Sequence, residues 1–272
     1  MNNNESTVIS LPNSSYGIVG VNEKFLGKRI IDNRIGVVKF PLSVDSLDCV
    51  NEAVCYHLGL LFGFDVAEAS LELYKGRTCV ISCYSNNFIF EYNDIKTLKS
   101  ILGTANFHSK FKMDWIFSNF GKMGQIKFIQ MVLFDTITNQ RDRHINNIAF
   151  SNDNLYSLYD NGRSLFFYEP HYQEYKRKLL SNKFFSFSDT FYTNEHGYGW
   201  LWLEDSIGYD EYKNYINLNV SFDDILTIFN YFYKDKERAY LTAIYVYRVY
   251  MYFIRKSGIS LEELLYYYKL NF

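Results

Sequence analysis

"RDRHINNIAFSNDNLYSLYDNGRSLF", residues 141–166, carries more polar side chains than a hydrophobic core requires. The stretch holds three Asp, five Asn and one His around two short apolar runs. The runs "IAF" and "LYSLYD" flank "SNDN", a pattern that is typical of two strands joined by a turn. The stretch therefore predicts a hairpin with polar side chains at its open end.

A turn centred between Asp153 and Asn154 would place Asn147 opposite Asp160, with their Cβ atoms about 5 Å apart. Asp142 lies five residues before Asn147, on the loop that leads into the hairpin. Carboxylate and amide oxygens in this arrangement suit Mg²⁺, which takes one or two carboxylates and completes its shell with water and substrate phosphates. The hairpin therefore predicts a magnesium site.

Phosphoryl transfer is the reaction that uses such a set. It needs a carboxylate for the attacking hydroxyl, an Asn and an Asp for magnesium, and a Lys for the phosphates. The protein-kinase catalytic loop spaces its Asp and Asn by five, as Asp142 and Asn147 are spaced here, and a second Asp then precedes a Gly. In this chain the second element is "YDNG", with Asp160 and Gly162.

The chain before this stretch changes its apolar period twice. Residues 16–40 are strand-like and end in "IGVVKF", whereas residues 44–64 have apolar positions three and four apart, which predicts an amphipathic helix that ends at Gly63. Residues 69–85 return to strand character around Lys75-Gly76. We therefore predict a small sheet-containing lobe over residues 1–94.

Residues 95–272 favour a mainly helical lobe. Apolar residues of 124–138 recur on one helical face, and Ser221 and Ser260 each begin a capping-box pattern. The apolar stretch 239–254 is too short and too rich in Tyr to cross a membrane, and it contains an arginine, so we predict a buried helix. The chain has no flexible linker, which favours two closely packed lobes.

The charge, the N-terminus and the cysteines indicate which partners and which cellular compartment to expect. The formal net charge is −2 and the Lys and Arg residues are scattered, so we expect neither direct nucleic-acid binding nor membrane binding. The N-terminus has no basic region and no apolar core, so it predicts no secretory signal. Cys79 and Cys83 lie on one face of a predicted strand as small hydrophobic residues, and the four cysteines suit a reduced, cytoplasmic setting.

Five motifs together resemble the HipA-like serine/threonine kinases. "NQRDRHINNIAF" and "LYDNGRSLF" are similar to the catalytic loop and the metal-binding segment of that family. "GVNEK" (20–24) is similar to its Gly-rich loop, "VVKFP" (37–41) to its ATP-lysine strand, and "NEAVCYHLGLLFGFDV" (51–66) to its glutamate-bearing helix. The order and spacing of these motifs over residues 17–166 imply an α+β, bilobal protein-kinase-like fold.

The resemblance also implies an activity. The expected reaction is ATP- and Mg²⁺-dependent transfer of the γ-phosphate to a Ser or Thr of a protein substrate, and the expected partners include an antitoxin or regulatory protein. The resemblance assigns ATP phosphate binding and catalysis to Lys39, ion pairing with Lys39 to Glu52, the catalytic base to Asp142, Mg²⁺ ligation to Asn147 and Asp160, and the Gly-rich loop to Gly17 and Gly20.

Two departures from the family pattern stand out. The motifs begin close to the first residue given, so we expect a short form without the extra N-terminal subdomain of the longer members. Gly17 occupies the position where some members carry a regulatory serine, which argues against a switch by loop autophosphorylation, although Ser14 and Ser15 lie just upstream.

Other interpretations remain open at this stage. Asp142 and Asn147 are residue types that favour turns, and Lys39 and Glu52 are types that are common on exposed strands and helices. His144 is interpreted as a brace for the loop. The chain could also be a catalytically silent kinase-like module that binds a nucleotide or a partner, or a small-molecule or lipid kinase.

Overall fold

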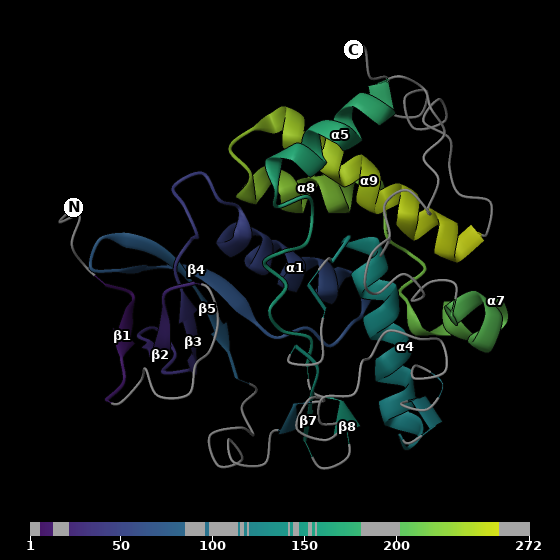
Figure 1. The fold of residues 1–272 in the computed structure, drawn as a ribbon, viewed down its shortest axis with the longest axis horizontal. Helices are drawn as coiled ribbons and strands as arrows, with labels where there is room; N and C mark the ends of the chain where they lie inside the picture. Colours follow the sequence, from purple (N-terminus) through teal and green to yellow (C-terminus); the bar gives the residue numbers. More distant parts are fainter. Residues whose placement is uncertain are drawn as a thin grey trace.

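The computed structural model describes residues 6–12, 22–84, 96–97, 114, 117–118, 120–140, 142–143, 147–151, 154–155, 157–180 and 202–255. An antiparallel sheet with the order β1-β2-β3-β5-β4 occupies one end of the molecule, and helices occupy the other (Figure 1). The strands of this sheet are β1 Val8–Ser10, β2 Lys24–Arg29, β3 Ile35–Lys39, β4 Ala69–Tyr74 and β5 Arg77–Cys83.

The helix predicted between the strands is α1, Asp48–Phe62. It ends as predicted at Gly63, whose φ of 80° lies in the left-handed region that glycine adopts without strain. The predicted β4–β5 hairpin turns at Lys75 and Gly76, which have φ angles of 48° and 76°. Two consecutive positive φ angles match the right-handed twist of the flanking strands, so this turn fixes the pairing of Tyr74 with Arg77.

The helical part contains α4 and α9, the two longest helices among the described residues. Its elements are α4 Lys122–Ile137, α5 Glu169–Leu180, the π-helix η3 Leu203–Ile207, α7 Tyr209–Tyr212, the 3-10 helix η4 Lys213–Tyr215, α8 Phe222–Phe232 and α9 Lys236–Arg255. Ser221 caps α8 in the predicted capping box, and α9 contains the stretch 239–254. The helix predicted at Ser260 lies outside the described residues. Among the helices described, none has the length and apolar character that a membrane crossing requires.

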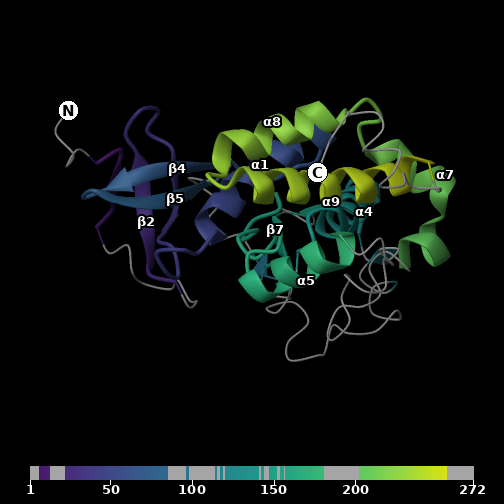
Figure 2. The ribbon, with the colours of Figure 1, turned by 90° about the horizontal axis from the view of Figure 1, so that it is seen from above.

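Helix α1 packs against both parts of the molecule. Val54, Leu58 and Phe62 belong to the same buried cluster as the apolar residues of α4 and α9. Near the start of α1, Cys49 packs on the sheet residues Ala69 and Val80. Both views show α8 running beside α1 (Figures 1 and 2). Helix α1 is therefore the element through which the sheet meets the helical core.

The polar stretch forms a short hairpin, but its predicted register is wrong. Strand β7 is Ala149–Ser151 and strand β8 is Asn154–Leu155, with β6 Lys96–Thr97 on the other side of β7. Ser151 pairs with Asn154, which leaves two residues between the strands; the predicted pairing would have left four. Two-residue loops are the commonest hairpin connections. The described ladder therefore does not place Asn147 opposite Asp160.

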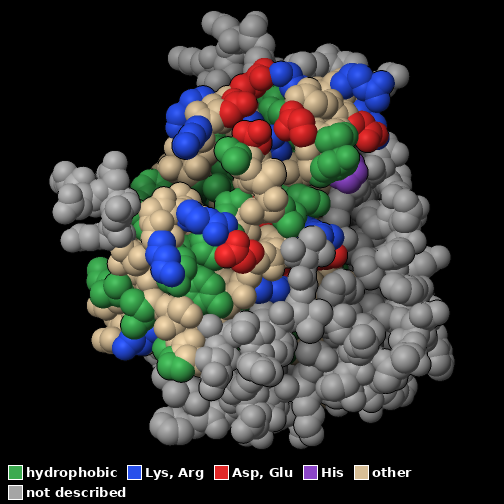
Figure 3. Space-filling model, turned by 60° about the vertical axis from the view of Figure 1, so that its left-hand side comes forward, with side chains coloured by type: hydrophobic (Ala, Val, Ile, Leu, Met, Phe, Trp, Pro, Cys, Tyr) green, Lys and Arg blue, Asp and Glu red, His purple; other side chains and the backbone are tan. Residues whose placement is uncertain are grey.

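Charged side chains are mixed on the surface. On the face shown in Figure 3, Lys and Arg side chains lie among Asp and Glu side chains rather than in one stripe. The cysteines are buried and free, and Cys79 and Cys83 both lie in β5 as predicted.

Candidate active site

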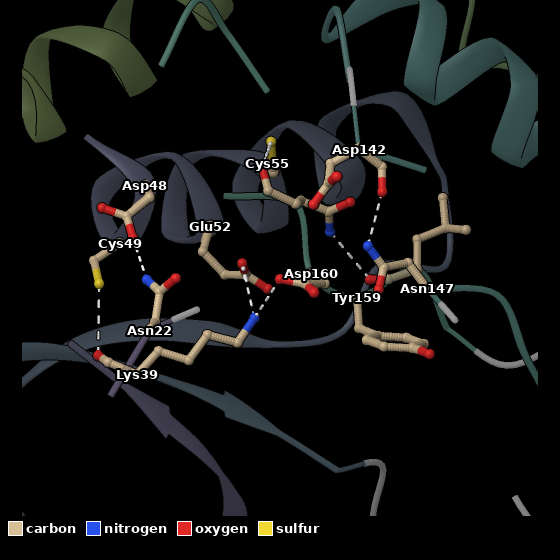
Figure 4. Close-up of polar contacts among 12 residues, drawn as sticks. Asn22, Lys39, Asp48, Cys49, Glu52, Cys55, Asp142, Asn147, Tyr159 and Asp160 are labelled. Atoms are coloured by element: carbon tan, nitrogen blue, oxygen red, sulfur yellow. Dashed lines mark hydrogen bonds and ion pairs between the residues drawn. The ribbon is translucent and has the colours of Figure 1, made fainter. Parts of the chain in front are cut away.

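Lys39, Glu52 and Asp160 meet where the sheet joins the helices. The Nζ atom of Lys39 lies 3.3 Å from Oε2 of Glu52 and 2.9 Å from Oδ1 of Asp160 (Figure 4). Lys39 ends β3, Glu52 lies in the second turn of α1, and Asp160 follows β8. The Glu52 side chain is 3% exposed, whereas that of Asp160 is 39% exposed, so the group is open on the Asp160 side.

The surroundings of Lys39 and Asp160 shift the pKa of both groups. Burial opposes the charge of Lys39, but Glu52 and Asp160 outweigh burial and raise its pKa above the ordinary value. Burial also opposes the charge of Asp160, but the ion pair with Lys39 outweighs it and lowers the Asp160 pKa to about 2. At neutral pH the group therefore holds an ammonium and an ionised, partly exposed carboxylate.

Lys24 is a second cation near this group and was not among the predicted site residues. It pairs directly with Lys39 across β2 and β3, so both side chains lie on the same face of the sheet. Burial lowers the pKa of Lys24, and the charge of Asp160 opposes that effect. The signal in the sequence was its place at the end of "GVNEK".

Asp142 lies on a loop that is closed by its own polar groups. Nδ2 of Asn147 donates to the carbonyl of Asp142 at 2.8 Å, and the N–H of Asp142 donates to Oε1 of Gln140 at 3.0 Å. The carboxylate of Asp142 is partly exposed, and Nη1 of Arg163 lies 3.4 Å from its Oδ1. The backbone of Asp142 is therefore held by two hydrogen bonds, while its carboxylate stays partly exposed.

Arg143 is the residue that holds this loop against the segment around Asp160. Its Nη1 donates to the carbonyls of Asn147 and Tyr159 at 3.2 and 2.7 Å. Its Nη2 donates to Oδ1 of Asn161 at 2.7 Å. These contacts, rather than the predicted hairpin register, bring the two polar segments together. Arg143 was not among the predicted site residues, because the sequence shows it only as one arginine inside a polar stretch.

The backbone at Asp160 adopts an unusual conformation. Its φ of 56° lies in the left-handed region, which non-glycine residues rarely occupy. Nε2 of Gln140 donates to the carbonyl of Asp160 at 3.1 Å and helps to hold it there. Two residues later, a Cβ on Gly162 would lie 2.9 Å from the carbonyl oxygen of Asp48, so glycine lets this segment approach the start of α1.

The predicted Gly-rich loop is described only at its end. Gly17 and Gly20 lie outside the described residues, as does His144. Nδ2 of Asn22 donates to the carbonyl of Phe40 at 3.0 Å and to Oδ2 of Asp48 at 2.5 Å. The end of "GVNEK" is therefore tied to the residue after β3 and also to the first residue of α1, Asp48, as Figure 4 shows.

The oxygen atoms of Asp160 and Asn147 are the candidate ligands for the expected magnesium. Within the described parts of the chain, no group of three or more His, Cys, Asp or Glu side chains could hold a metal ion by itself. Asp160 offers a partly exposed carboxylate, and Asn147 uses its amide nitrogen on Asp142, which leaves the amide oxygen as an acceptor. One carboxylate and one amide suit Mg²⁺ that arrives with substrate phosphates, since its other ligands are then phosphate and water.

Comparisons of the whole chain with solved structures identify its fold class. The sheet-plus-helices architecture matches the proinflammatory kinase CtkA of Helicobacter pylori with a TM-score of 0.64 and 17% identity, over 96% of each chain. The protein therefore has an α+β, bilobal protein-kinase-like fold, as the resemblance implied. HipA of Shewanella oneidensis, solved with HipB and operator DNA, matches with a TM-score of 0.42 and 12% identity, over 95% of this chain and 63% of HipA. No protein-family model and no curated protein matches the sequence.

Proposed function

We propose that the protein is a HipA-like, ATP- and Mg²⁺-dependent kinase that transfers the γ-phosphoryl group of ATP to a Ser or Thr of a protein. The observation that carries the proposal is Lys39, held by Glu52 and Asp160 at the junction of sheet and helices. The likeness of the fold to a kinase supports it. The same proposal divides the chain into a sheet-containing lobe, residues 1–94, and a helical lobe, residues 95–272, with ATP between them.

Each residue has a role in this proposal. Lys39, with Lys24 beside it, binds the ATP phosphates, while Gly17 and Gly20 belong to the loop that covers them. Magnesium held by Asp160 and Asn147 would neutralise charge on the phosphates. Asp142 orients the acceptor hydroxyl and takes its proton as the acceptor oxygen bonds to the γ-phosphorus. The bond from that phosphorus to the bridging oxygen breaks, and ADP leaves.

The acceptor side faces the Asp142 loop. The carboxylate of Asp142 is partly exposed and has one oxygen near Arg163, so its other oxygen serves the incoming hydroxyl. A protein substrate, rather than a nucleic acid or a membrane, is the expected acceptor. An antitoxin or regulatory protein as a further partner and a cytoplasmic location belong to the same proposal.

Transfer of labelled phosphate tests the proposal. The purified protein is incubated with γ-labelled ATP, Mg²⁺ and, in separate samples, a protein lysate, lipid vesicles and a small-molecule extract. We expect label on Ser or Thr of protein. Label in lipid or in small molecules alone would contradict the protein-kinase assignment, and ATP binding without any transfer would identify a silent module.

Asp142→Asn is the matched control for this assay. The change keeps the size of the side chain and removes its ability to take the proton, so transfer should be lost. Nucleotide binding should persist, because Asp142 acts on the acceptor and not on ATP. Binding is measured by the thermal shift that ATP and Mg²⁺ produce in the same variant. Loss of that shift would make Asp142 a nucleotide-binding residue.

A further inference from the structure

We propose that Asn51 is a positioning residue that fastens α1 to the helical part of the molecule, so that Glu52 stays beside Lys39 without any covalent modification of the protein. The catalytic consequence rests on the proposed kinase function. The fastening itself rests on hydrogen bonds and packing of the described residues and can be tested without activity.

Asn51 is fully buried and uses both ends of its amide. Its Nδ2 donates to the carbonyl of Ser164 at 2.7 Å, and its Oδ1 accepts from the hydroxyl of Tyr233 at 2.7 Å. These partners are 113 and 182 residues away in the sequence. One side chain of α1 thereby joins the segment that follows Asp160 to Tyr233, the residue at the C-terminal cap of α8.

Movement of α1 would be costly because of this burial. Tyr233 is itself buried, so withdrawal of Asn51 would leave a buried hydroxyl without this acceptor, and the buried Ser164 carbonyl would keep only the N–H of Phe167, at 3.1 Å. An unsatisfied buried polar group costs more than an ordinary hydrogen bond contributes. Since Glu52 is the next residue in the same helix, whatever fixes Asn51 also fixes the Glu52 backbone.

The other end of α1 has its own anchor to the helical part. The N–H of Asn217 donates to the carbonyl of Phe62 at 2.9 Å, and its Nδ2 donates to the carbonyl of Leu61 at 2.9 Å. The Phe62 ring stacks on Tyr250 of α9 with 5.2 Å between ring centroids. Figure 2 shows α8 alongside α1 over this length. Both ends of the helix are therefore held by residues of the helical part.

This anchoring bears on regulation. In protein kinases, phosphorylation of the activation loop controls whether the lysine–glutamate pair forms, because it controls the position of the glutamate helix. Here the segment after Asp160 already holds α1 through the Ser164 carbonyl, and the Ser164 side chain is fully buried. We therefore expect the purified, unphosphorylated protein to have its Lys39–Glu52 pair formed.

A matched pair of tyrosine variants tests the role of Asn51. Tyr233→Phe removes only the hydroxyl from which Asn51 accepts a hydrogen bond. Tyr175→Phe removes a similar buried hydroxyl, which donates to the carbonyl of Leu241 at 2.9 Å, far from α1 in the sequence. Both are made in the full chain. Amide hydrogen exchange over residues 48–62 and phosphate transfer at saturating ATP are measured well below the melting temperature of each variant.

We expect the two variants to lose similar thermal stability but to differ in α1. Tyr233→Phe should speed amide hydrogen exchange in residues 48–62 on the order of tenfold relative to Tyr175→Phe, because loss of one hydrogen bond changes the local opening equilibrium by about that factor. Its kcat should fall several-fold, whereas Tyr175→Phe should retain the parent kcat. Asn51→Leu should show a larger effect on both readouts, and if it does not fold, the tyrosine pair still decides.

Three outcomes would overturn the proposal. Equal α1 exchange in the two tyrosine variants would show that Asn51 does not fasten the helix. Faster α1 exchange with an unchanged kcat would show that the contact does not position Glu52. A phosphatase-treated parent that loses activity would show that modification is needed. If the parent transfers no phosphate at all, the proposed function fails, and the exchange comparison alone still decides the fastening.

Discussion

Two cation-centred clusters meet at consecutive residues, because Arg143 binds Tyr159 and Asn161 while Lys39 binds Asp160, but they differ in how fully their groups are paired. Arg143 and Asp135 are each 3% exposed, and the guanidinium of Arg143 also donates to Asn147, Tyr159 and Asn161. In the second cluster, Lys39 has two carboxylate partners, one of which, Asp160, is 39% exposed.

This difference in pairing indicates that the Arg143 cluster is structural and that the Lys39 cluster is functional. A buried guanidinium surrounded by fixed acceptors has little capacity left for a ligand, so the Arg143 cluster holds backbone segments in place. Asp160 keeps a carboxylate oxygen for another partner, and a strongly shifted pKa with an open side is typical of functional groups. Disruption of the first cluster should affect folding, and disruption of the second should affect activity.

The largest effect on stability is expected for Arg143→Met. The change leaves the Asp135 carboxylate buried beside an apolar side chain, and removal of one partner of a buried ion pair costs about 3 to 5 kcal/mol. The free energy of unfolding from urea titrations measures it. A loss below about 1 kcal/mol would show that Arg143 is not the scaffold we describe.

The double variant Arg143→Met/Asp135→Leu is the matched control. Replacing both charges by apolar groups avoids the buried unpaired carboxylate, so it should recover part of the lost stability. The carbonyls of Asn147 and Tyr159 still lose their donor, so recovery should be incomplete. The comparison separates the ion pair from the loop contacts.

The sequence predicted those elements of the fold whose signals are local. Gly63 ends α1, Lys75-Gly76 turns the β4–β5 hairpin, and Ser221 caps α8, because each of these depends on residues a few positions apart. The predicted register of the β7–β8 hairpin was wrong because it assumed a loop centred on the turn residues. Several loop lengths are compatible with the same turn residues, so the sequence does not determine the register.

The candidate site divides in the same way. Lys39, Glu52 and Asp160 were proposed from short motifs, and the structure brings them into contact. Arg143 and Asn51 were missed because their importance depends on partners far along the chain, such as Asn161 for Arg143. Local pattern carries no information about such contacts.

Lys39→Met should have the largest effect on activity. Loss of a phosphate contact in a water-poor site costs about 3 to 4 kcal/mol of transition-state stabilisation, a fall in kcat on the order of 10² to 10³. The variant leaves Glu52 buried without its lysine, so it should also lose some stability. In the double variant Lys39→Met/Glu52→Gln, stability should recover while kcat stays low. Parent-like turnover in either would refute the role of Lys39.

Asp160→Asn should remove the Mg²⁺ dependence of the stabilisation by ATP without unfolding the protein. ATP should stabilise the parent against heat much more with Mg²⁺ than with EDTA, because a ligand that binds only the folded state raises stability by mass action. The substitution removes one charge from the cation and should erase most of that difference. Asn147→Ala should weaken it less, since water can partly replace a neutral ligand. An unchanged Mg²⁺ dependence in Asp160→Asn would remove Asp160 from the proposed metal site.

The smallest effect on stability is expected for Arg163→Gln. Arg163 and Asp142 form an ion pair at 3.4 Å, but their side chains are 39% and 28% exposed, so solvent screens the attraction. Such pairs contribute about 0 to 1 kcal/mol, and the contribution falls as salt rises. Urea titrations at low and high salt should therefore give nearly the same unfolding free energy for variant and parent, in contrast to Arg143→Met. A loss as large as that of Arg143→Met would show that Arg163 supports the loop structurally, and that the contrast between scaffold and site does not extend to the Asp142 side.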